Sequence, residues 1–200
     1  VNTGLQGYWK MGDGTNDEYP VIYDQTNPTN GSDLVINGDF ATDSDWTKAA
    51  NWTISDGKAI SNGSGLIYQT GVTYLDDKQY KVIFNADITS GGFTVRIGNT
   101  SSPVAVTQGL NTHYLSRISS NTTGYLFFQA NSGVGSIDNV SVKEVQGNPA
   151  LMTNMVEGNI TNQYPLTKIR NYYRMGDGIL DGYPIIQDQT SPNLAHIPTT

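Results

Sequence analysis

Cysteine is absent from the 200 residues, and basic residues are scarce. Without cysteine the chain has no disulfide framework and no thiolate ligands for metal ions. Lysine and arginine together number 11 against 18 aspartates and glutamates, which gives a formal net charge of −7. An acidic chain without a basic cluster repels phosphate backbones, so the composition argues against nucleic acid as a partner.

Histidine is nearly absent as well. The two histidines, His113 and His196, lie in different segments without a second ligand at metal-binding spacing. Neither supports a metal hydrolase or a serine–histidine arrangement. Glycoside hydrolysis needs two carboxyl groups that face one sugar bond, but Asp87 is the only acid in the clearest strand pattern. We therefore expect a protein that is not an enzyme.

Long apolar runs and helix-forming segments are also missing. The longest apolar run, Tyr125-Leu-Phe-Phe128, has four residues, whereas a membrane-spanning helix needs about 20, so no membrane span is predicted. Glutamate occurs three times and glycine 22 times, a balance that favours short strands and turns over helices. The chain opens at Val1 without a signal-peptide pattern, and we expect an internal segment or a processed product.

What the chain does contain is an internal repeat. Residues 8–28 return as residues 172–192 at a constant offset of 164, without a gap and with 13 of 21 positions identical. Each copy predicts a strand, a loop around Met-Gly-Asp-Gly, a short strand after Tyr-Pro and a turn. A repeat of this kind indicates tandem modules, with hairpin segments at 1–32 and 172–200.

The two copies share three aspartates. Around a glycine-rich loop these acids are interpreted either as calcium ligands or as caps of local turns. Their spacing does not match the EF-hand loop, which favours turn caps. The residues are Asp13, Asp17 and Asp24, matched by Asp177, Asp181 and Asp188.

Each copy is too short to bury its own apolar face, because a two-stranded hairpin alone is marginally stable in water. We expect four residues to be buried in equivalent contacts on the sandwich, on each other or on neighbouring chains, and the protein to work as a homo-oligomer. They are Trp9, Met11, Tyr173 and Met175. The connector 147–171 contains further apolar residues, which we also expect to be buried against another surface.

Residues 33–146 form the one predicted full domain. The clearest signal is residues 80–88, where apolar side chains alternate as in a half-buried antiparallel strand. Turns are predicted at Asp56-Gly57 and Gly91-Gly92. About nine short strands with turn signals between them predict an all-β fold, an antiparallel β-sandwich of the jelly-roll type. The segments include 34–40, 51–55, 58–61, 65–69, 93–97, 104–106, 114–115, 125–128 and 137–145.

Two motifs mark the ends of this domain: Leu34-Val-Ile-Asn-Gly-Asp-Phe40, followed by Trp46 and Asn51-Trp-Thr53, and Ile137-Asp-Asn-Val-Ser-Val142. They resemble carbohydrate-binding modules with a galactose-binding-like jelly roll. In that family a structural calcium ion often ties the first turn to the last strand, so the resemblance implies Asp39 and Asp138 as calcium ligands, with backbone carbonyls. The alternative is that Asp39 is a turn residue and Asp138 a solvated bulge.

The opening Leu5-Gln-Gly-Tyr-Trp-Lys-Met-Gly-Asp-Gly14, followed by Tyr23-Asp24, resembles the first strands of laminin-G-like, concanavalin-type jelly rolls. A chain in which concanavalin-like hairpins alternate with jelly rolls of the carbohydrate-binding type resembles repetitive structural proteins of tailed phages, particularly marine ones. The resemblances imply a non-catalytic structural module of a virion surface or fibre protein with host-surface or glycan adhesion. Its partners would be other copies of itself, other virion proteins and surface glycans, at the virion surface or outside the cell. The alternative is a carbohydrate-binding module of a secreted bacterial enzyme or adhesin.

A sugar site needs exposed aromatic side chains beside polar groups. Trp52 lies within a strand pattern and is predicted to be a core residue, and Trp46, which follows Asp43-Ser-Asp45, is predicted to lie at the edge of the core. Tyr68, Tyr74 and Tyr125 are the candidate ligand-binding residues. Each is equally consistent with a place at the rim of the core, with its hydroxyl in water.

Overall fold

The structure is a computed structural model that describes residues 6–10, 14–72, 74–98, 103–117 and 125–152. All of them belong to one of two units of the chain, Val1–Ile160, and the other unit, Thr161–Thr200, lies outside the described residues. The described part contains no helix, and hence none long and apolar enough to cross a membrane. The all-β prediction is confirmed. The strands are β1 (Val21–Ile22), β2 (Asn30–Asp33), β3 (Trp46–Lys48), β4 (Trp52–Ser55), β5 (Lys58–Asn62), β6 (Gly65–Gln69), β7 (Gln79–Ile97), β8 (Val104–Ala105), β9 (Gly109–Ser116), β10 (Leu126–Val145) and β11 (Ala150–Leu151).

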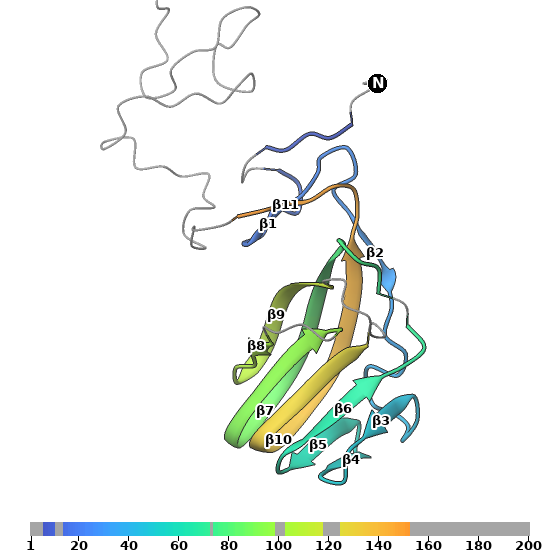
Figure 1. Cartoon of the computed structure of the whole chain (residues 1–200), viewed down its shortest axis with the longest axis vertical. Helices are drawn as coiled ribbons and strands as arrows, with labels where there is room; N and C mark the ends of the chain where they lie inside the picture. The colour runs from blue at the N-terminus through green and yellow to red at the C-terminus, as the bar shows by residue number, and fades with distance from the viewer. Residues whose placement is uncertain (1–5, 11–13, 73, 99–102, 118–124, 153–200) are drawn as a thin grey trace, which may run out of the picture. The chain divides into compact units, whose positions relative to one another are not determined.

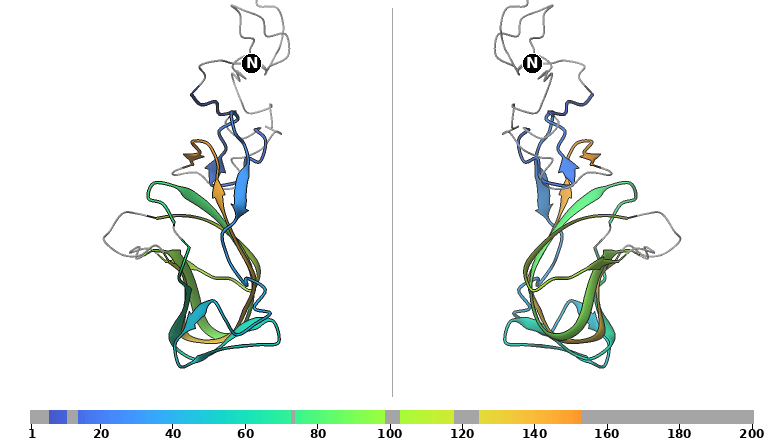
Figure 2. Two further views of the ribbon diagram at one scale, coloured as in Figure 1. Left: turned by 90° about the vertical axis from the view of Figure 1, so that its right-hand side faces the viewer. Right: turned by 90° about the vertical axis from the view of Figure 1, so that its left-hand side faces the viewer.

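Most strands form an antiparallel β-sandwich, as predicted (Figures 1 and 2). The layer that we call the front layer holds β3, β6, the first part of β10, the last part of β7, and β8. The back layer holds β4, β5, the rest of β10, the first part of β7, and β9. Because β7 and β10 pair along almost their whole length, these two strands join the layers.

The two long strands change layers where glycines allow a bend. The turn predicted at Gly91-Gly92 is instead a bend within β7, which continues to Ile97. Gly91 has a φ of 71°, and a Cβ at this position would lie 2.1 Å from the Ser132 carbonyl oxygen of β10. Only glycine combines this backbone conformation with so close an approach, so the bend depends on it.

The core lies between the layers and is built by side chains at alternate positions of each strand. Tyr80 and Phe84 of β7 point inward and are fully buried. Phe84 packs edge-on against Phe128 of β10, with ring centroids 4.9 Å apart. Trp52 is a core residue, as predicted, with 3% of its surface exposed, and Trp46, predicted at the edge of the core, is buried with 7% exposed. Burying one large apolar side chain contributes about 1.5–3 kcal/mol, so these residues hold the layers together.

Several strands lie where the sequence predicts them. β6 has the predicted bounds, Gly65–Gln69. β4 and β5 form the predicted hairpin, and its turn residues Asp56 and Gly57 have φ values of 54° and 70°. Positive φ at both central residues is what a tight two-residue turn between antiparallel strands requires.

The segment 34–40, predicted as a strand, is irregular instead. The strand lies before it, at Asn30–Asp33, and pairs with the end of β10. A Cβ on Gly38 would lie 2.0 Å from the Val140 carbonyl oxygen, so here the chain turns and passes very close to β10. Phe40 is 1% exposed. Burial of this side chain in the core accounts for an apolar residue at the end of segment 34–40 although the segment is not a strand.

The first repeat copy is ordered by its own aspartates. Asp17 accepts hydrogen bonds from two backbone N–H groups, at 2.7 and 3.0 Å. Asp24 accepts from the N–H groups of Tyr8 and Thr26, both at 2.9 Å. These contacts are those of turn caps, the interpretation that the spacing favours. Asp13 lies outside the described residues.

A strand from the connector 147–171 completes the first copy. β1 (Val21–Ile22) pairs with β11 (Ala150–Leu151), and among the described residues of its own copy Val21 forms an isolated bridge with Glu18. Trp9 is half-buried, and its indole N–H donates to the Asn148 carbonyl at 2.9 Å. The other three predicted contact residues lie outside the described residues: Met11, Tyr173 and Met175. Burial of these four residues in equivalent contacts therefore stays a prediction.

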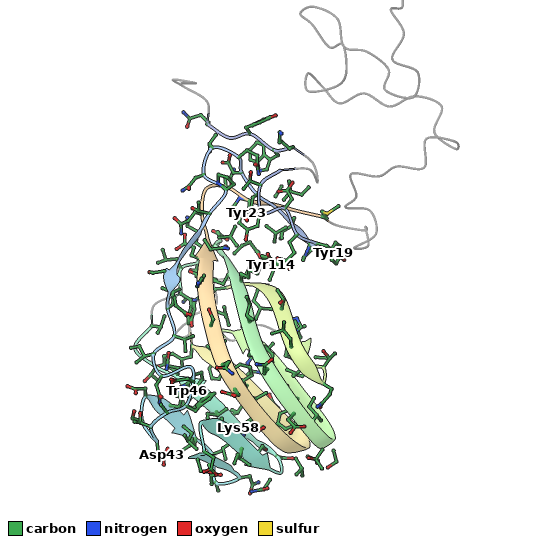
Figure 3. All side chains as sticks on the ribbon, turned by 180° about the vertical axis from the view of Figure 1, so that it is seen from behind. Tyr19, Tyr23, Asp43, Trp46, Lys58 and Tyr114 are labelled. Atoms are coloured by element: carbon green, nitrogen blue, oxygen red, sulfur yellow. The ribbon has the colours of Figure 1, made fainter. Side chains whose placement is uncertain are left out.

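The first copy also packs against one end of the sandwich (Figure 3). Tyr23 is buried with Val145 of β10, and its hydroxyl lies 3.5 Å from that of Tyr114 on β9. The Glu18 carboxylate accepts from the Tyr114 hydroxyl at 2.8 Å and pairs with Lys81 of β7. Burial raises the pKa of Glu18, but the hydrogen bonds from Lys81 and Tyr114 outweigh burial and hold the pKa below its ordinary value.

Candidate functional site

The outward side of the front layer carries a cluster of aromatic side chains. Cross-strand pairing aligns Tyr68 of β6 with Phe127 of β10, and Phe127 with Arg96 of β7. Tyr125 comes directly before β10 and lies on the same side as Phe127, because side chains alternate along an extended chain. By the same alternation Gln129 follows on this side. We call Tyr68, Tyr125, Phe127, Arg96 and Gln129 the aromatic face.

The three rings of the aromatic face contact each other. Tyr68 and Tyr125 are stacked, with centroids 5.7 Å apart and planes 15° apart. The Phe127 ring lies 5.4 Å from that of Tyr68 and 5.9 Å from that of Tyr125. All three side chains are half-buried. The outward side of a solvated sheet normally carries polar residues, so a contiguous aromatic cluster there marks a candidate binding surface.

Polar groups border these rings. The Arg96 guanidinium lies over the Phe127 ring, 4.9 Å from its centroid. Its Nη1 donates to Gln129 Oε1 at 3.4 Å, and the Gln129 amide donates to Asn131 at 3.0 Å. The aromatic face therefore combines flat apolar rings with hydrogen-bond donors and acceptors.

Tyr74, the third predicted ligand-binding residue, requires a correction because it lies in the core. Its side chain is 0% exposed and packs edge-on against Tyr80, with ring centroids 5.1 Å apart. Burial raises the pKa of the Tyr74 hydroxyl far above its ordinary value, and this hydroxyl has no hydrogen-bond partner in the described part of the chain. A ligand on the surface cannot reach Tyr74. Of the three predicted ligand-binding residues, Tyr68 and Tyr125 therefore remain candidates.

Asp39 and Asp138 lie where the first turn of the domain adjoins the last strand. The Val140 N–H donates to the Gly38 carbonyl at 2.8 Å, which brings these segments together. Asp39 accepts from a backbone N–H two residues further on, and both oxygens of Asp138 accept from Asn139. Calcium takes roughly six to eight oxygen ligands, and the described residues hold no group of three or more acidic or histidine side chains. Calcium at Asp39 and Asp138 stays a prediction.

His113 of β9 lies against the core. Its ring centroid is 5.8 Å from that of Phe84. Burial lowers the pKa of His113, and its Nε2 has no partner among the described residues. The other histidine, His196, lies outside the described residues. His113 therefore occupies a packing position, away from the aromatic face.

A shallow groove crosses the back layer over β5, β10 and β7. Its volume is about 290 Å³, and Lys58, Asp87 and Ser136 contribute polar groups to its lining. The described residues that line it include no aromatic side chain. Because stacking against rings is missing there, the aromatic face is the stronger candidate for sugar binding.

No protein family and no curated protein matches the chain. Some solved structures share a weak likeness. One is the enzymatically active domain of tailspike protein 4 of bacteriophage CBA120, with 18% identity and a TM-score of 0.41 over 56% of this chain and 21% of that chain. Another is a mutant of the family 29 carbohydrate-binding module CBM29-2, with 12% identity and a TM-score of 0.39 over 63% of this chain and 96% of that chain. A CBM4 structure has 12% identity and a TM-score of 0.34 over 54% of this chain and 94% of that chain.

The match thus spans about a fifth of the length of the tailspike domain. At TM-scores of this size, the function has to be inferred from the side chains of this chain.

Three members of the aromatic face were not predicted as site residues: Phe127, Arg96 and Gln129. A signal for them exists, because alternation places Phe127 and Gln129 on the side of Tyr125, and places Arg96 opposite its buried neighbours Val95 and Ile97. The pairing of β6 with β10, and of β10 with β7, brings these residues together, and no local pattern specifies it.

Proposed function

We propose that this part of the chain is a non-catalytic glycan-binding module and that the aromatic face is its binding surface. The observation that carries the proposal is the contiguous cluster of Tyr68, Tyr125 and Phe127 on the outward side of a sheet. A pyranose ring has an apolar C–H side and a rim of hydroxyl groups. Flat aromatic rings bordered by Gln129, Arg96 and the tyrosine hydroxyls complement both parts.

A glycan array with the 200-residue chain tests this proposal. Tyr68→Ala and Phe127→Ala each remove one ring, and we expect binding to weaken by about 1–2 kcal/mol, or roughly 5- to 30-fold, for each. Tyr8→Ala is the matched control, because the Tyr8 side chain is 44% exposed and lies in the first repeat copy. Absence of binding to any glycan would refute the proposal, and so would equal binding by wild type and both ring variants.

The finer proposal is that the module belongs to a virion surface or fibre protein and serves adhesion to a host surface. Its support is the internal repeat at an offset of 164, which suits an array of similar modules in one long chain. The location would be the virion surface or the outside of a cell, with surface glycans and other copies of the chain as partners.

The alternative is a carbohydrate-binding module of a secreted bacterial enzyme or adhesin. The gene that encodes the full-length protein distinguishes the two. Further copies of the Met-Gly-Asp-Gly segment, within a cluster of phage structural genes, are expected for the virion protein. A neighbouring cluster of polysaccharide-degrading enzymes would favour the alternative.

A further inference from the structure

Among the described residues, Arg96 is the one charged side chain on the outward side of the front layer. The other outward positions of its strands carry apolar or uncharged polar residues, and neither aspartate nor glutamate: Thr47, Leu66, Tyr68, Thr94, Ala105, Tyr125, Phe127 and Gln129. In a chain with a net charge of −7, these outward positions carry the positive charge of Arg96 and no acidic side chain.

Arg96 also lacks an acidic partner. Among the described residues it forms no ion pair, and its only hydrogen bond is the long one from Nη1 to Gln129, at 3.4 Å. Its Nε is buried and has no hydrogen-bond partner in the described part of the chain. Other basic residues of the sandwich do pair with acids: Lys48 with Asp43, Lys78 with Glu144, Lys81 with Glu18, and Arg117 with Asp76. A guanidinium has five N–H donors, so Arg96 retains most of its capacity.

The position of Arg96 is suited to a planar anion. Its guanidinium rests on the Phe127 ring, 4.9 Å from the centroid, so the side chain is held by a cation–π contact rather than by an acid. Because Nε is buried, the edge of the guanidinium that a ligand can use is the one formed by Nη1 and Nη2, and two N–H groups on one edge match the two oxygens of a carboxylate. The stacked pair Tyr68 and Tyr125 lies beside Phe127, where it would contact the sugar ring that carries the carboxylate.

We propose that the aromatic face selects glycans that carry a carboxylate, such as chains with uronic acid units, and that Arg96 binds this group. The inference deepens the proposed function and rests on it. Hydrogen bonds to a charged group are stronger than neutral ones, so removing the charge from either partner is expected to weaken binding about 10- to 100-fold.

The first experiment changes the ligand and leaves the protein intact. Acidic glycans and their methyl esters, which keep the sugar backbone but lose the charge, are compared by calorimetry with the wild-type chain. We expect the free acid to bind about 10- to 100-fold more tightly than the ester, and its affinity to fall as salt is raised. Equal affinity for acid and ester overturns the inference, as does binding confined to neutral glycans. Absence of binding to any glycan, acidic or neutral, overturns the proposed function itself, which keeps the two failures distinct.

The second experiment changes the protein. Arg96→Gln is expected to reduce affinity for the acid to that for the ester, while affinity for the ester stays within about twofold of wild type. Arg96→Lys keeps the charge but loses the fork of N–H groups, so it should recover only part of the preference. Lys58→Gln is the matched control, since Lys58 is an exposed lysine on β5 of the back layer (Figure 3). If Arg96→Gln weakens acid and ester equally, Arg96 acts only by supporting Phe127, and the inference fails.

Discussion

Asp24 is expected to be the main polar anchor of the first repeat copy. It is 1% exposed and accepts hydrogen bonds from the Tyr8 N–H, the Thr26 N–H and hydroxyl, and the Asn148 N–H, at 2.7–3.3 Å. Asp24→Asn keeps the shape but removes the charge, and its amide donor would face at least one of these N–H groups. Charge-assisted bonds contribute about 1 kcal/mol more than neutral ones, so three weakened bonds predict a loss of about 3 kcal/mol, and the fourth bond, to the N–H group that the amide faces, is lost in addition.

The pH dependence of this contribution follows from the same contacts. Burial raises the pKa of Asp24, but the hydrogen bonds from Tyr8, Thr26 and Asn148 outweigh it and hold the pKa below its ordinary value. A carboxyl group whose pKa is lower in the folded chain than in the unfolded chain stabilises the fold at pH values above its unfolded pKa, which is about 3.9 for aspartate. This stability is lost as the pH falls through the folded pKa. The free energies of unfolding of wild type and Asp24→Asn should therefore approach each other as the pH falls below about 4.

Hydrogen exchange is the suitable assay, because it reports the backbone amides of Tyr8, Thr26 and Asn148 individually. At pH 7 we expect Asp24→Asn to reduce protection there, while amides of β7 keep theirs. Asp43→Asn is the matched control, because the Asp43 side chain is 58% exposed and pairs with Lys48 on the surface, where an ion pair contributes about 0–1 kcal/mol. Unchanged protection at the three amides in Asp24→Asn would refute the reasoning.

Three further predictions concern the repeat, calcium and assembly. Glu18→Gly, which introduces the residue of the second copy, should cost about 1–2 kcal/mol in urea unfolding by removing the contacts to Lys81 and Tyr114; a loss equal to that of the Asp43→Asn control would count against this docking contact. If calcium binds at Asp39 and Asp138, a chelator should lower the Tm of the wild type and leave Asp138→Ala unchanged; identical melting of the wild type with and without chelator removes the site. Changing Trp9 and Tyr173 to Ser should release monomers from an oligomer while the sandwich stays folded, as measured by light scattering; a wild-type chain that is monomeric at high concentration contradicts this.

Local pattern alone was enough to establish the all-β class and several individual strands. The alternation of residues 80–88 and the Asp56-Gly57 turn depend on side-chain direction and backbone conformation within a few residues, and these are properties that the sequence encodes directly. The assignment of Trp52 to the core followed from the same local pattern. Local pattern misled at Gly91-Gly92, because glycines that permit a turn equally permit a bend between two layers.

The candidate site, in contrast, depends on pairing between distant segments. Tyr68 meets Phe127 because β6 pairs with β10, and Phe127 meets Arg96 because β10 pairs with β7. Tyr74 lies outside every predicted strand, so no alternation indicates its direction, and packing against Tyr80 buries it completely. Which strands pair, and in which register, is decided by how all apolar side chains fill the core together. For this reason the residues of the aromatic face could be assigned to an outward side from the sequence, but they became neighbours only in the folded sandwich.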